Sequence, residues 1–401
     1  MLTTSLNKPE RGIVWLMWLG VLGLMAFGVA FVFSATGKRE LDHGVAWYNY
    51  TAVRQIIAYG IGFSAVAALC LIDYGRLARW SLVAYWIGIL LLIAVPLFGV
   101  DRLGARRWID FGLVQFQPSE FAKLGFLFAL ANFLARPMGE LTSPALFLKA
   151  LGMAALPLIL ILKQPDLGSA LAIMSMVLVM MYVAGVPQRL LLRLLGVSGF
   201  IIALVLVDIF FAPPNWHFFK LKEYQRQRLL VYFDLDFAPK NATEAQRREA
   251  RAEKEKKKYN IDQALISVGS GGLSGKGWRQ GTQGALGYLP PAGAHNDFIF
   301  SVLAEEEGFL GSLAVLFLYG AILFSGIRIA GQARDRLGRI LAAGVVTLLF
   351  THIFVNIGMN IRLMPVTGIP LPLLSAGGTS VLCSLVALGI LQNIHLYRRR
   401  Y

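Results

Sequence analysis

The sequence predicts an all-α polytopic membrane protein, and three observations indicate that class. The chain has 401 residues, of which 56% are hydrophobic and 15% are charged, unlike the composition of a soluble domain. Apolar runs recur at about 20 residues, the length that crosses a bilayer as a helix. The basic residues fall between these runs, where they face lipid headgroups, so the net charge of +15 favours a membrane over nucleic acid.

About ten transmembrane helices are expected, with one long loop between the seventh and the eighth. Arg76, Arg79 and Arg136 lie in short loops that share one side with both termini. Because basic residues accumulate in short cytoplasmic loops, both termini are expected in the cytoplasm and the long loop outside. The expected spans are residues 13–33, 52–72, 80–99, 118–135, 146–162, 167–185, 190–211, 305–328, 338–359 and 373–395.

The chain is expected to form one integral membrane domain over residues 1–401, with a large extracytoplasmic loop at 212–297. Within this loop, residues 240–258 are highly charged and carry almost no apolar side chains. Such a run forms a solvated helix, with i,i+4 pairs such as Glu244–Arg248, or stays disordered. It has no apolar face to bury, so no catalytic role is expected there.

The short outer loop before the fourth span carries Arg102, Arg106 and Arg107, against the charge rule for short outer loops. Two explanations stay open. The arginines pair locally with Asp101 and Asp110, or they form an anion site, since guanidinium groups match phosphate oxygens in charge and geometry.

The fourth span opens with polar and charged residues. Gln117, Glu120 and Lys123 share a helix face at i, i+3 and i+6, and Pro118 suits the first turn. An ionised side chain within a bilayer costs about 2.5–3.5 kcal/mol, so such residues normally face a bundle interior and mark function. The alternative is a Glu120–Lys123 pair that satisfies only itself.

Asp166 follows Pro165, which separates the fifth and sixth spans. An aspartate at this point can cap the next helix by accepting hydrogen bonds from its free N–H groups. That role does not exclude a place in a polar cavity, and both interpretations are retained.

The ninth span carries His352, Asn356 and Asn360 at i, i+4 and i+8, a polar stripe typical of contacts between membrane helices. His352 is expected to be a hydrogen-bonded packing residue rather than a metal ligand or a proton relay. The Pro/Gly-rich run 364–378 then predicts a rigid, irregular segment that re-enters the membrane beside a cavity, with Ser375 in it. No set of His, Cys and carboxylate residues shows metal-ligand spacing.

The stretch 259–311 is the one long glycine-rich, polar segment, and the chemistry is expected there. Its run 269–277 is close to a phosphate-binding Walker loop, but Ser270 replaces the first glycine and Gly277 replaces the final Ser or Thr. A nucleotide site is therefore not supported. The glycines still allow close approach of a ligand to the backbone, with Lys276 beside them.

Asp297 stands directly before an apolar helix in the same stretch. One interpretation is a helix N-cap, which its position suits. However, the run 298–328 is too long for one span, so its first turns are expected at the interface or in a cavity, with Asp297 at the mouth.

In these residues the chain resembles the SEDS family (shape, elongation, division and sporulation), with its RodA branch nearest and its FtsW branch next. The resemblance covers most of the length from about residue 100 onward. The motifs that carry it are GARRW, QPSEFAK, KQPDLGSAL, YQRQR, ISVGSGGLSGKGWRQGTQ, DFIF with AEEEGFLG, and VNIGM followed by PVTGIPLPLLSAGG.

The resemblance implies a peptidoglycan glycosyltransferase in the bacterial cytoplasmic (inner) membrane that polymerises lipid II into glycan strands, for cell-wall elongation and cell shape. It also implies a class B penicillin-binding protein as the partner transpeptidase. The other implied partners are lipid II, undecaprenyl-diphosphate-linked glycan and membrane lipids, with no nucleic acid. Two alternatives stay open: a lipid II flippase or transporter, although no clear inverted repeat is visible, and a scaffold for the penicillin-binding protein.

The resemblance also implies roles for single residues. The family's essential aspartate matches Asp297, which is expected to be the general base on the acceptor 4-hydroxyl in an inverting reaction with a lipid-diphosphate-linked donor. A divalent cation, Mg²⁺ or Mn²⁺, is the one cofactor considered, because it could share stabilisation of the leaving diphosphate. The expected substrate-binding residues are Arg107, Glu120, Lys123, Asp166, Lys276 and Ser375.

The chain departs from the family pattern at several positions. Relatives usually show Pro-Glu where this chain has Pro290-Pro291, so any role of that missing carboxylate is in doubt. Asn296 replaces a threonine, Arg362 replaces a small or apolar residue, and Ala376 replaces a tyrosine. The basic stretch 240–258 resembles an insertion.

Overall fold

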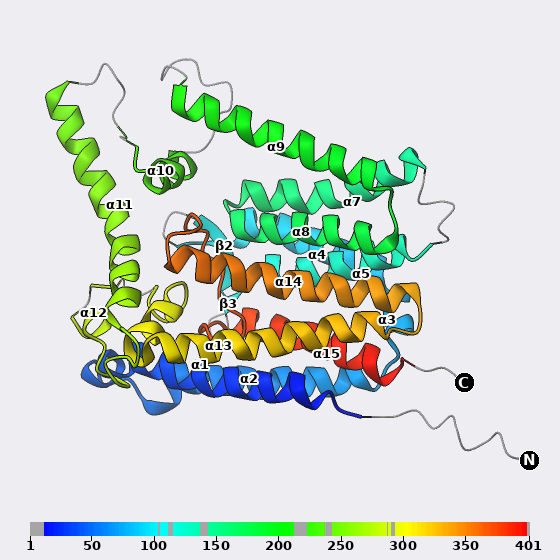
Figure 1. Cartoon of the computed structure of the whole chain (residues 1–401), viewed down its shortest axis with the longest axis horizontal. Helices are drawn as coiled ribbons and strands as arrows, with labels where there is room; N and C mark the ends of the chain where they lie inside the picture. Colours follow the sequence, from blue (N-terminus) through cyan, green and yellow to red (C-terminus); the bar gives the residue numbers. More distant parts are fainter. Residues whose placement is uncertain are drawn as a thin grey trace, which may run out of the picture.

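The computed structural model describes residues 12–102, 105–110, 115–136, 143–211, 223–235, 237, 243–286, 288–289 and 293–398. Pro290 and Pro291 lie outside these residues, as do the side chains of Asp101 and Arg102. The long helices run side by side in one bundle (Figure 1). The start of α1 and the end of α15 lie at one end of the bundle, and α11 and α12 lie at the other.

The described elements have the following bounds. They are α1 (Trp15–Asp42), η1 (Trp47–Asn49), α2 (Thr51–Cys70), α3 (Tyr74–Arg79), α4 (Ser81–Phe98), β1 (Val100–Arg102), β2 (Ala105–Asp110), β3 (Gln115–Phe116), α5 (Pro118–Leu134), α7 (Pro144–Lys163), α8 (Leu167–Ala184), α9 (Gln188–Phe211), α10 (Glu223–Tyr232), α11 (Glu244–Ser270), α12 (Thr282–Ala285), α13 (Ile299–Gly331), α14 (Arg336–Asn360) and α15 (Gly378–Leu396).

Nine helices of the described chain are long and apolar enough to cross a membrane, namely α1, α2, α4, α7, α8, α9, α13, α14 and α15. Each overlaps a predicted span. The predicted span 118–135 corresponds to α5, which has 17 residues and packs against α4, α8 and α14. The prediction of an all-α polytopic membrane protein is confirmed.

Burial sorts the helices into an interior and a periphery. In α14 and α15, 72% and 78% of an apolar 18-residue stretch is buried inside the protein. In α9, only 6% of the corresponding stretch is buried. The outer position of α9 is visible in Figure 1. The polar side chains of α5 and α14 are therefore surrounded by neighbouring helices instead of lipid, as membrane insertion requires.

The predicted span 305–328 begins earlier than expected, because α13 starts at Ile299. The helix is interrupted at Gly308, whose φ of 66° and ψ of −158° are not helical. Beyond this kink, the N–H groups of Phe309 and Leu310 donate to the carbonyls of Gly272 and Leu273 in the glycine-rich loop. The kink thus exposes backbone groups that dock the loop against α13.

A small antiparallel sheet with the order β1-β2-β3 joins α4 to α5, and the sequence did not suggest it. Its strands are short, so they show too few alternating residues to be recognised. The sheet matters for function because β2 carries Arg107.

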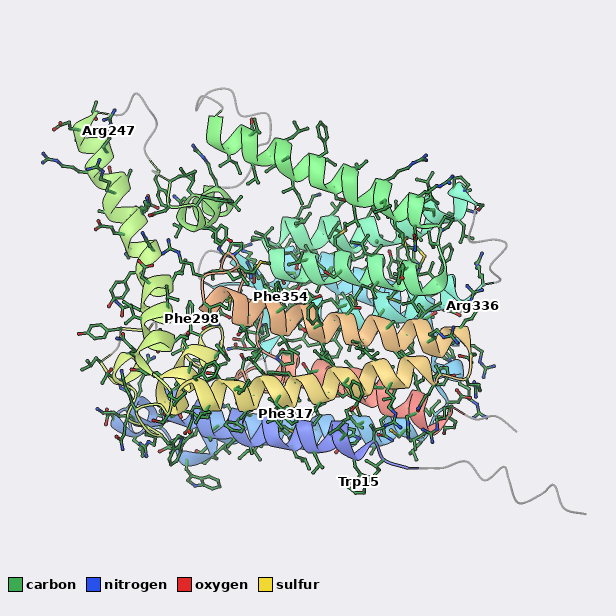
Figure 2. All side chains as sticks on the ribbon, viewed as in Figure 1. Trp15, Arg247, Phe298, Phe317, Arg336 and Phe354 are labelled. Atoms are coloured by element: carbon green, nitrogen blue, oxygen red, sulfur yellow. The ribbon has the colours of Figure 1, made fainter. Side chains whose placement is uncertain are left out.

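The charged segment 240–258 is helical from Glu244 onward, where α11 begins. The predicted Glu244–Arg248 pair is confirmed at 3.8 Å between Oε2 and Nη2, and both side chains are exposed. Figure 2 shows Arg247 near the tip of α11, which lies across the end of the bundle, and Arg336 at the opposite end.

Candidate active site

The segment 365–377 between α14 and α15 is not helical, yet most of it is buried. Irregular backbone at membrane depth is tolerated only where other parts of the protein satisfy its polar groups. Here the carbonyls of Ile369, Pro372 and Leu373 accept hydrogen bonds. The donors are Asn356 Nδ2 at 2.7 Å, the Tyr319 hydroxyl at 2.6 Å and the Tyr59 hydroxyl at 2.5 Å.

This segment and α14 together hold the turn that carries Asp297. The amides of Asn356 and Asn360 donate to the Asp297 carbonyl at 3.2 and 3.0 Å. The Ser375 hydroxyl donates to the Asn296 carbonyl at 2.6 Å and accepts from the N–H of Leu371 at 2.8 Å. The predicted site residue Ser375 therefore lies next to Asp297, and its hydroxyl is engaged with backbone.

The side chain of Asp297 does not cap α13. The N-cap of this helix is Phe298, and no side chain accepts a hydrogen bond there. The N-cap interpretation of Asp297 is therefore wrong. The turn fixes the Asp297 backbone and leaves the partly buried carboxylate available for another role.

Arg107 reaches the same place from β2. Its Nε donates to the Gln164 carbonyl at 3.3 Å, and its Nη2 donates to the Pro165 carbonyl. A Cβ atom added to Gly368 would lie 3.6 Å from Arg107 Nη1 and 3.7 Å from Asp297 Oδ2. Arg107 and Asp297 thus both lie close to Gly368, whose φ of 75° favours glycine.

The charge environment of Asp297 is mixed. Burial raises the pKa of its carboxyl above the ordinary value, whereas the positive charges of Arg228 and Arg107 act to lower it. The two arginines come from α10 and β2, so the site draws on segments far apart in the sequence.

Glu120 and Lys123 form the predicted intrahelical pair, and a third residue joins it. Lys123 Nζ lies 2.7 Å from Glu120 Oε1 and 2.9 Å from His352 Nε2. His352 also hydrogen-bonds the backbone of Pro370, inside the 365–377 segment. The charges on α5 therefore support that segment, and the prediction that His352 is a hydrogen-bonded packing residue is confirmed.

Asp166 caps α8, which confirms one of its two interpretations. Its Oδ1 accepts from the N–H of Ser169 at 3.0 Å, and its Oδ2 accepts from the hydroxyls of Ser169 and Ser119 at 2.8 and 3.2 Å. Because Ser119 belongs to α5, the buried carboxylate joins the starts of two helices. It also follows directly after Gln164 and Pro165, which hold Arg107.

Lys276 belongs to a second cluster, at the kink of α13. Its Nζ lies 2.6 Å from Glu305 Oε1 and 2.8 Å from the Thr282 hydroxyl. The buried Glu305 also accepts from the N–H groups of Thr282 and Gln283. Within the described part of the chain, Lys276 thus contacts the glycine-rich loop, α12 and α13, and no contact joins it to Asp297.

Comparison with known proteins agrees with these motifs. The sequence profile of a family described as "Cell cycle protein" (FtsW, RodA, SpoVE) matches residues 14–400. The peptidoglycan glycosyltransferase MrdB of Escherichia coli K12 is 39% identical over 324 residues, 80% of this chain and 79% of that protein. This chain belongs to the FtsW/RodA/SpoVE family.

Solved structures share the fold of this FtsW/RodA/SpoVE protein. The Thermus thermophilus rod shape determining protein RodA has a TM-score of 0.66 at 29% identity, covering 98% of this chain and 100% of that one. A chain described under "Structural coordination of polymerization and crosslinking by a peptidoglycan synthase complex" has a TM-score of 0.76 at 29% identity, covering 97% and 99%.

Sequence reasoning missed Arg228 as a site residue of this FtsW/RodA/SpoVE protein. Arg228 is the last residue of the YQRQR motif at 224–228. Only the fold shows that α10 brings this charge to Asp297.

Three further groups near the site have unsatisfied polar atoms. Gln117 Oε1, Asn296 Oδ1 and Thr367 Oγ1 are buried and have no hydrogen-bond partner among the described residues. Buried polar atoms are nearly always paired, so unpaired ones beside Asp297 and Asp166 indicate positions where a ligand hydroxyl or a water would bind.

Proposed function

We propose that this peptidoglycan glycosyltransferase polymerises lipid II, with Asp297 as the general base. One observation carries the proposal: the Asp297 carboxylate is held beside Arg107 and does not cap the helix that it precedes. A group with an ordinary structural role would use its carboxylate on the helix N-terminus. The names of the relatives, glycosyltransferase and RodA, support the same substrate class.

In the proposed reaction, the acceptor 4-hydroxyl of lipid II attacks the anomeric carbon of the growing strand. The new C–O bond forms as the bond to the undecaprenyl diphosphate breaks, and the configuration inverts. The hydroxyl proton passes to Asp297, a transfer that is typically worth about 10²–10⁴ in rate. The carboxylate must therefore be ionised before the reaction.

The departing diphosphate accumulates negative charge, which nearby cations stabilise. Arg107 and Arg228 are the cations that act on Asp297, and they are proposed for this role. Guanidinium groups suit it because they match phosphate oxygens in geometry. Lys123 and Lys276 are also expected to bind the diphosphate, but each is paired with a carboxylate. They are therefore proposed to support the structure around the site.

The other predicted site residues are proposed to position the reacting groups. Ser375 holds the Asp297 turn, Asp166 fixes the start of α5 and α8, and Glu120 anchors Lys123. Asn296 and Thr367 are proposed to bind sugar hydroxyls through their unpartnered oxygen atoms.

A divalent cation is the one cofactor that the sequence leaves open. In the described part of the chain, no group of three His, Cys, Asp or Glu residues could hold a metal ion. The carboxylate at the site faces two arginines, whose charge opposes a cation and already serves the diphosphate. These donors do not fit a resident metal, and the proposed reaction uses none.

The proposed orientation places both termini in the cytoplasm and Asp297 on the outer side of the inner membrane. Arg76 and Arg79 lie in α3, the short helix between α2 and α4, and Arg136 lies just after α5, as expected for cytoplasmic connections between membrane spans. A class B penicillin-binding protein is the proposed partner. The description of the similar complex, which names both polymerization and crosslinking, supports a crosslinking partner.

Glycan synthesis from purified lipid II tests the proposal. Wild type is compared with Asp297→Asn and with Asp234→Asn, each purified with the penicillin-binding protein, whose own activity is blocked. Asp234 is a matched control, because it pairs with the side chains of Lys254 and Lys258 in the same outer region. Wild type and Asp234→Asn should make strands, and Asp297→Asn should lose about 10²–10⁴ of the rate.

The other outcomes are equally informative. Strands of equal yield from Asp297→Asn would show that the base lies elsewhere. If no variant makes strands, although all stay folded and bound to the partner, the flippase or scaffold alternative gains support. Lipid II transport assays would then separate those two.

A further inference from the structure

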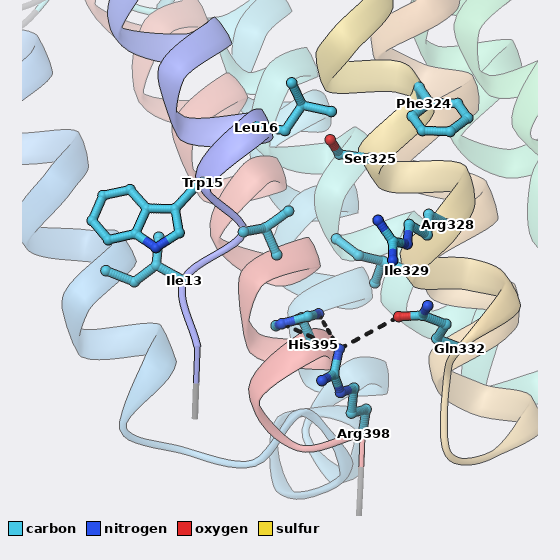
Figure 3. Close-up of a pocket in the computed structure, with 11 residues that line it drawn as sticks. Ile13, Trp15, Leu16, Phe324, Ser325, Arg328, Ile329, Gln332, His395 and Arg398 are labelled. Carbon is cyan, nitrogen blue, oxygen red and sulfur yellow. Dashed lines mark hydrogen bonds between the residues drawn. The ribbon is translucent and has the colours of Figure 1, made fainter. Parts of the chain in front are cut away.

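The two ends of the bundle differ in their relation to Asp297. At one end, a pocket of about 650 Å³ lies between the start of α1 and the ends of α13 and α15 (Figure 3). No residue of the proposed reaction lines this pocket. At the other end, α10 and α11 contact the turn that follows α14, residues 361–364, close to the α14 side chains that hold Asp297. Contacts at this second end can therefore affect the site.

The end of α14 supports both Asp297 and α10. In the last turn of the helix, Asn360 Nδ2 donates to the Asp297 carbonyl at 3.0 Å. Three residues later, the Leu363 carbonyl accepts from the hydroxyl of Tyr232, the last residue of α10, at 2.9 Å. The reacting carboxylate and α10 thus share one support.

Tyr232 also influences which way α10 faces. It lies four residues after Arg228, so the two side chains share one face of the helix. The positive charge of Arg228 acts on Asp297. Next to Arg228, Gln227 Nε2 donates to Oε1 of Glu253 in α11 at 3.0 Å, so α11 supports α10 as well. The Tyr232 hydroxyl therefore holds toward α14 the face of α10 that carries Arg228.

Arg362, in the 361–364 turn, has a backbone conformation that suits glycine better than arginine. Its φ is 60°, and the N–H of Leu363 donates to the Gly358 carbonyl at 2.7 Å, an arrangement that commonly ends a helix with glycine. A side chain is disfavoured in this left-handed conformation. The arginine nevertheless makes a distant contact, because its Nη1 lies 3.4 Å from Oδ1 of Asp262 in α11. Arg362 thus joins the turn to α11 although its backbone is strained.

We propose, building on the proposed function, that the 361–364 turn positions the α10–α11 pair so that Arg228 stays beside Asp297. Tyr232 and Arg362 are the positioning residues. Tyr232 acts on α10 directly, and Arg362 acts through its ion pair with α11. Loss of either contact should let Arg228 move away from the carboxylate, while the residues of the reaction itself stay unchanged.

The sign of a pKa shift separates positioning from a direct effect of charge. Arg228 and Arg107 both act to lower the pKa of Asp297, and the α14 side chains that touch Asp297 are uncharged asparagines. Asp262→Ala removes a negative charge, which by itself would lower the pKa of Asp297. Loss of position instead withdraws the charge of Arg228 and raises that pKa. The fall in rate at low pH should then begin at a higher pH.

Glycan synthesis by the full-length protein, purified with the blocked penicillin-binding protein, is measured as a function of pH. The variants are Asp262→Ala, Tyr232→Phe and Arg362→Gly, each alone and combined with Arg228→Gln. Glu255→Ala and Tyr259→Phe are matched controls in α11. Both control side chains are exposed, and neither has a hydrogen bond or ion pair in the described part of the chain.

Asp262→Ala and Tyr232→Phe should each slow synthesis about 2–10-fold, the effect of one hydrogen bond, and move the fall in rate to higher pH. Neither should shift it further once Arg228 is replaced. Arg362→Gly should slow synthesis similarly, although its unfolding midpoint should not fall, because glycine suits the turn. A shift to lower pH in Asp262→Ala, shifts that add to that of Arg228→Gln, full activity in Arg362→Gly, or equal effects in the controls would overturn the proposal.

Infrared spectroscopy separates this positioning from the proposed function, because it follows the protonation of Asp297 without catalysis. The carboxyl band of Asp297 is identified by its absence from Asp297→Asn. If the band titrates at higher pH in Asp262→Ala than in wild type, but the rate does not follow it, the positioning stands and Asp297 is not the base. If the band titrates as in wild type, the turn does not position Arg228, whatever the rates.

Discussion

Lys123 Nζ lies 2.9 Å from His352 Nε2, in a part of the bundle where both side chains are buried. An ammonium group can only donate, so Nε2 of His352 must accept and cannot carry a proton. The positive charge of Lys123 is thus matched by one carboxylate, Glu120, and the histidine stays neutral. The contact connects α5 to α14 beside the candidate active site.

Lys123→Met should destabilise the protein by about 3–5 kcal/mol, because it leaves Glu120 as an uncompensated buried charge. Lys123→Met/Glu120→Gln should recover most of this loss. Reversible unfolding in mixed micelles measures both. Arg248→Met is the control, since its pair with Glu244 is exposed, at 84% and 91%, and should contribute less than about 1 kcal/mol. A single variant as stable as wild type would contradict a buried charge pair.

Polymerisation should fall as the pH drops through the pKa of Asp297, because the base must be ionised. Burial places that pKa above its ordinary value, so the loss should begin at a higher pH than for an exposed aspartate. Arg228→Gln removes a charge that lowers the pKa, and the acid limb should move to still higher pH. Rate–pH profiles measure the shift.

Arg248→Gln is the control for charge alone in these profiles, because Arg248 is exposed and should leave the acid limb in place. An acid limb that stays fixed in Arg228→Gln would mean that Asp297 is not the titrating base, or that Arg228 does not act on it.

Gly368→Ala should slow strand synthesis by roughly 10² while the protein still folds. The added methyl would lie 3.6 Å from Arg107 Nη1 and 3.7 Å from Asp297 Oδ2, in space that the proposed reaction gives to the reacting groups. Misplacement at a site can cost roughly 10² in rate. Gly44→Ala is the control, because Gly44 also has a positive φ, 62°, but no atom within 4 Å of the new methyl.

Both glycine variants should lose roughly 1–2 kcal/mol of stability, since each places alanine in a left-handed conformation. Only Gly368→Ala should lose activity. Equal rates in a glycan assay for the two variants would show that the space beside Gly368 is not used by substrate.

Lys276→Met should loosen the glycine-rich loop and cost about 1.5–3 kcal/mol, the usual value of a hydrogen bond to a charged group. Lys276→Met should therefore also reduce strand synthesis. The double variant Lys276→Met/Glu305→Gln should restore both stability and strand synthesis, because it also removes the buried negative charge that Lys276 neutralises. If the double variant folds and still makes no strands, Lys276 contacts the diphosphate directly.

The sequence predicts local features of this protein well. Long apolar runs locate nine membrane helices, and Asp166 after Pro165 predicts the cap of α8. Each of these two signals depends only on residues that are close together in the sequence. Relationships between distant residues carry no such signal. Lys123 contacts His352, and the charge of Arg228 acts on Asp297, only after the helices pack.

The glycine-rich loop shows the same limit. Its glycines suggested close approach of a ligand, but Gly271 and Gly275 lie against the backbone of α13 itself. A Cβ atom on either would collide with the carbonyls of Ala304 or Glu306. The glycines predicted a close neighbour but not its identity, and only the fold shows that this neighbour includes the chain's own kinked helix.

The hydrogen bonds that hold the segment 365–377 also constrain the order of assembly. Its carbonyls accept from Tyr59 in α2, Tyr319 in α13 and Asn356 in α14. Each unsatisfied carbonyl in hydrocarbon would cost several kcal/mol, so the segment cannot settle at depth before those three helices are in place. The Asp297 turn rests on this segment, so the turn should reach its final position only after those three helices are in place, and an incompletely inserted chain should lack the site of the proposed reaction.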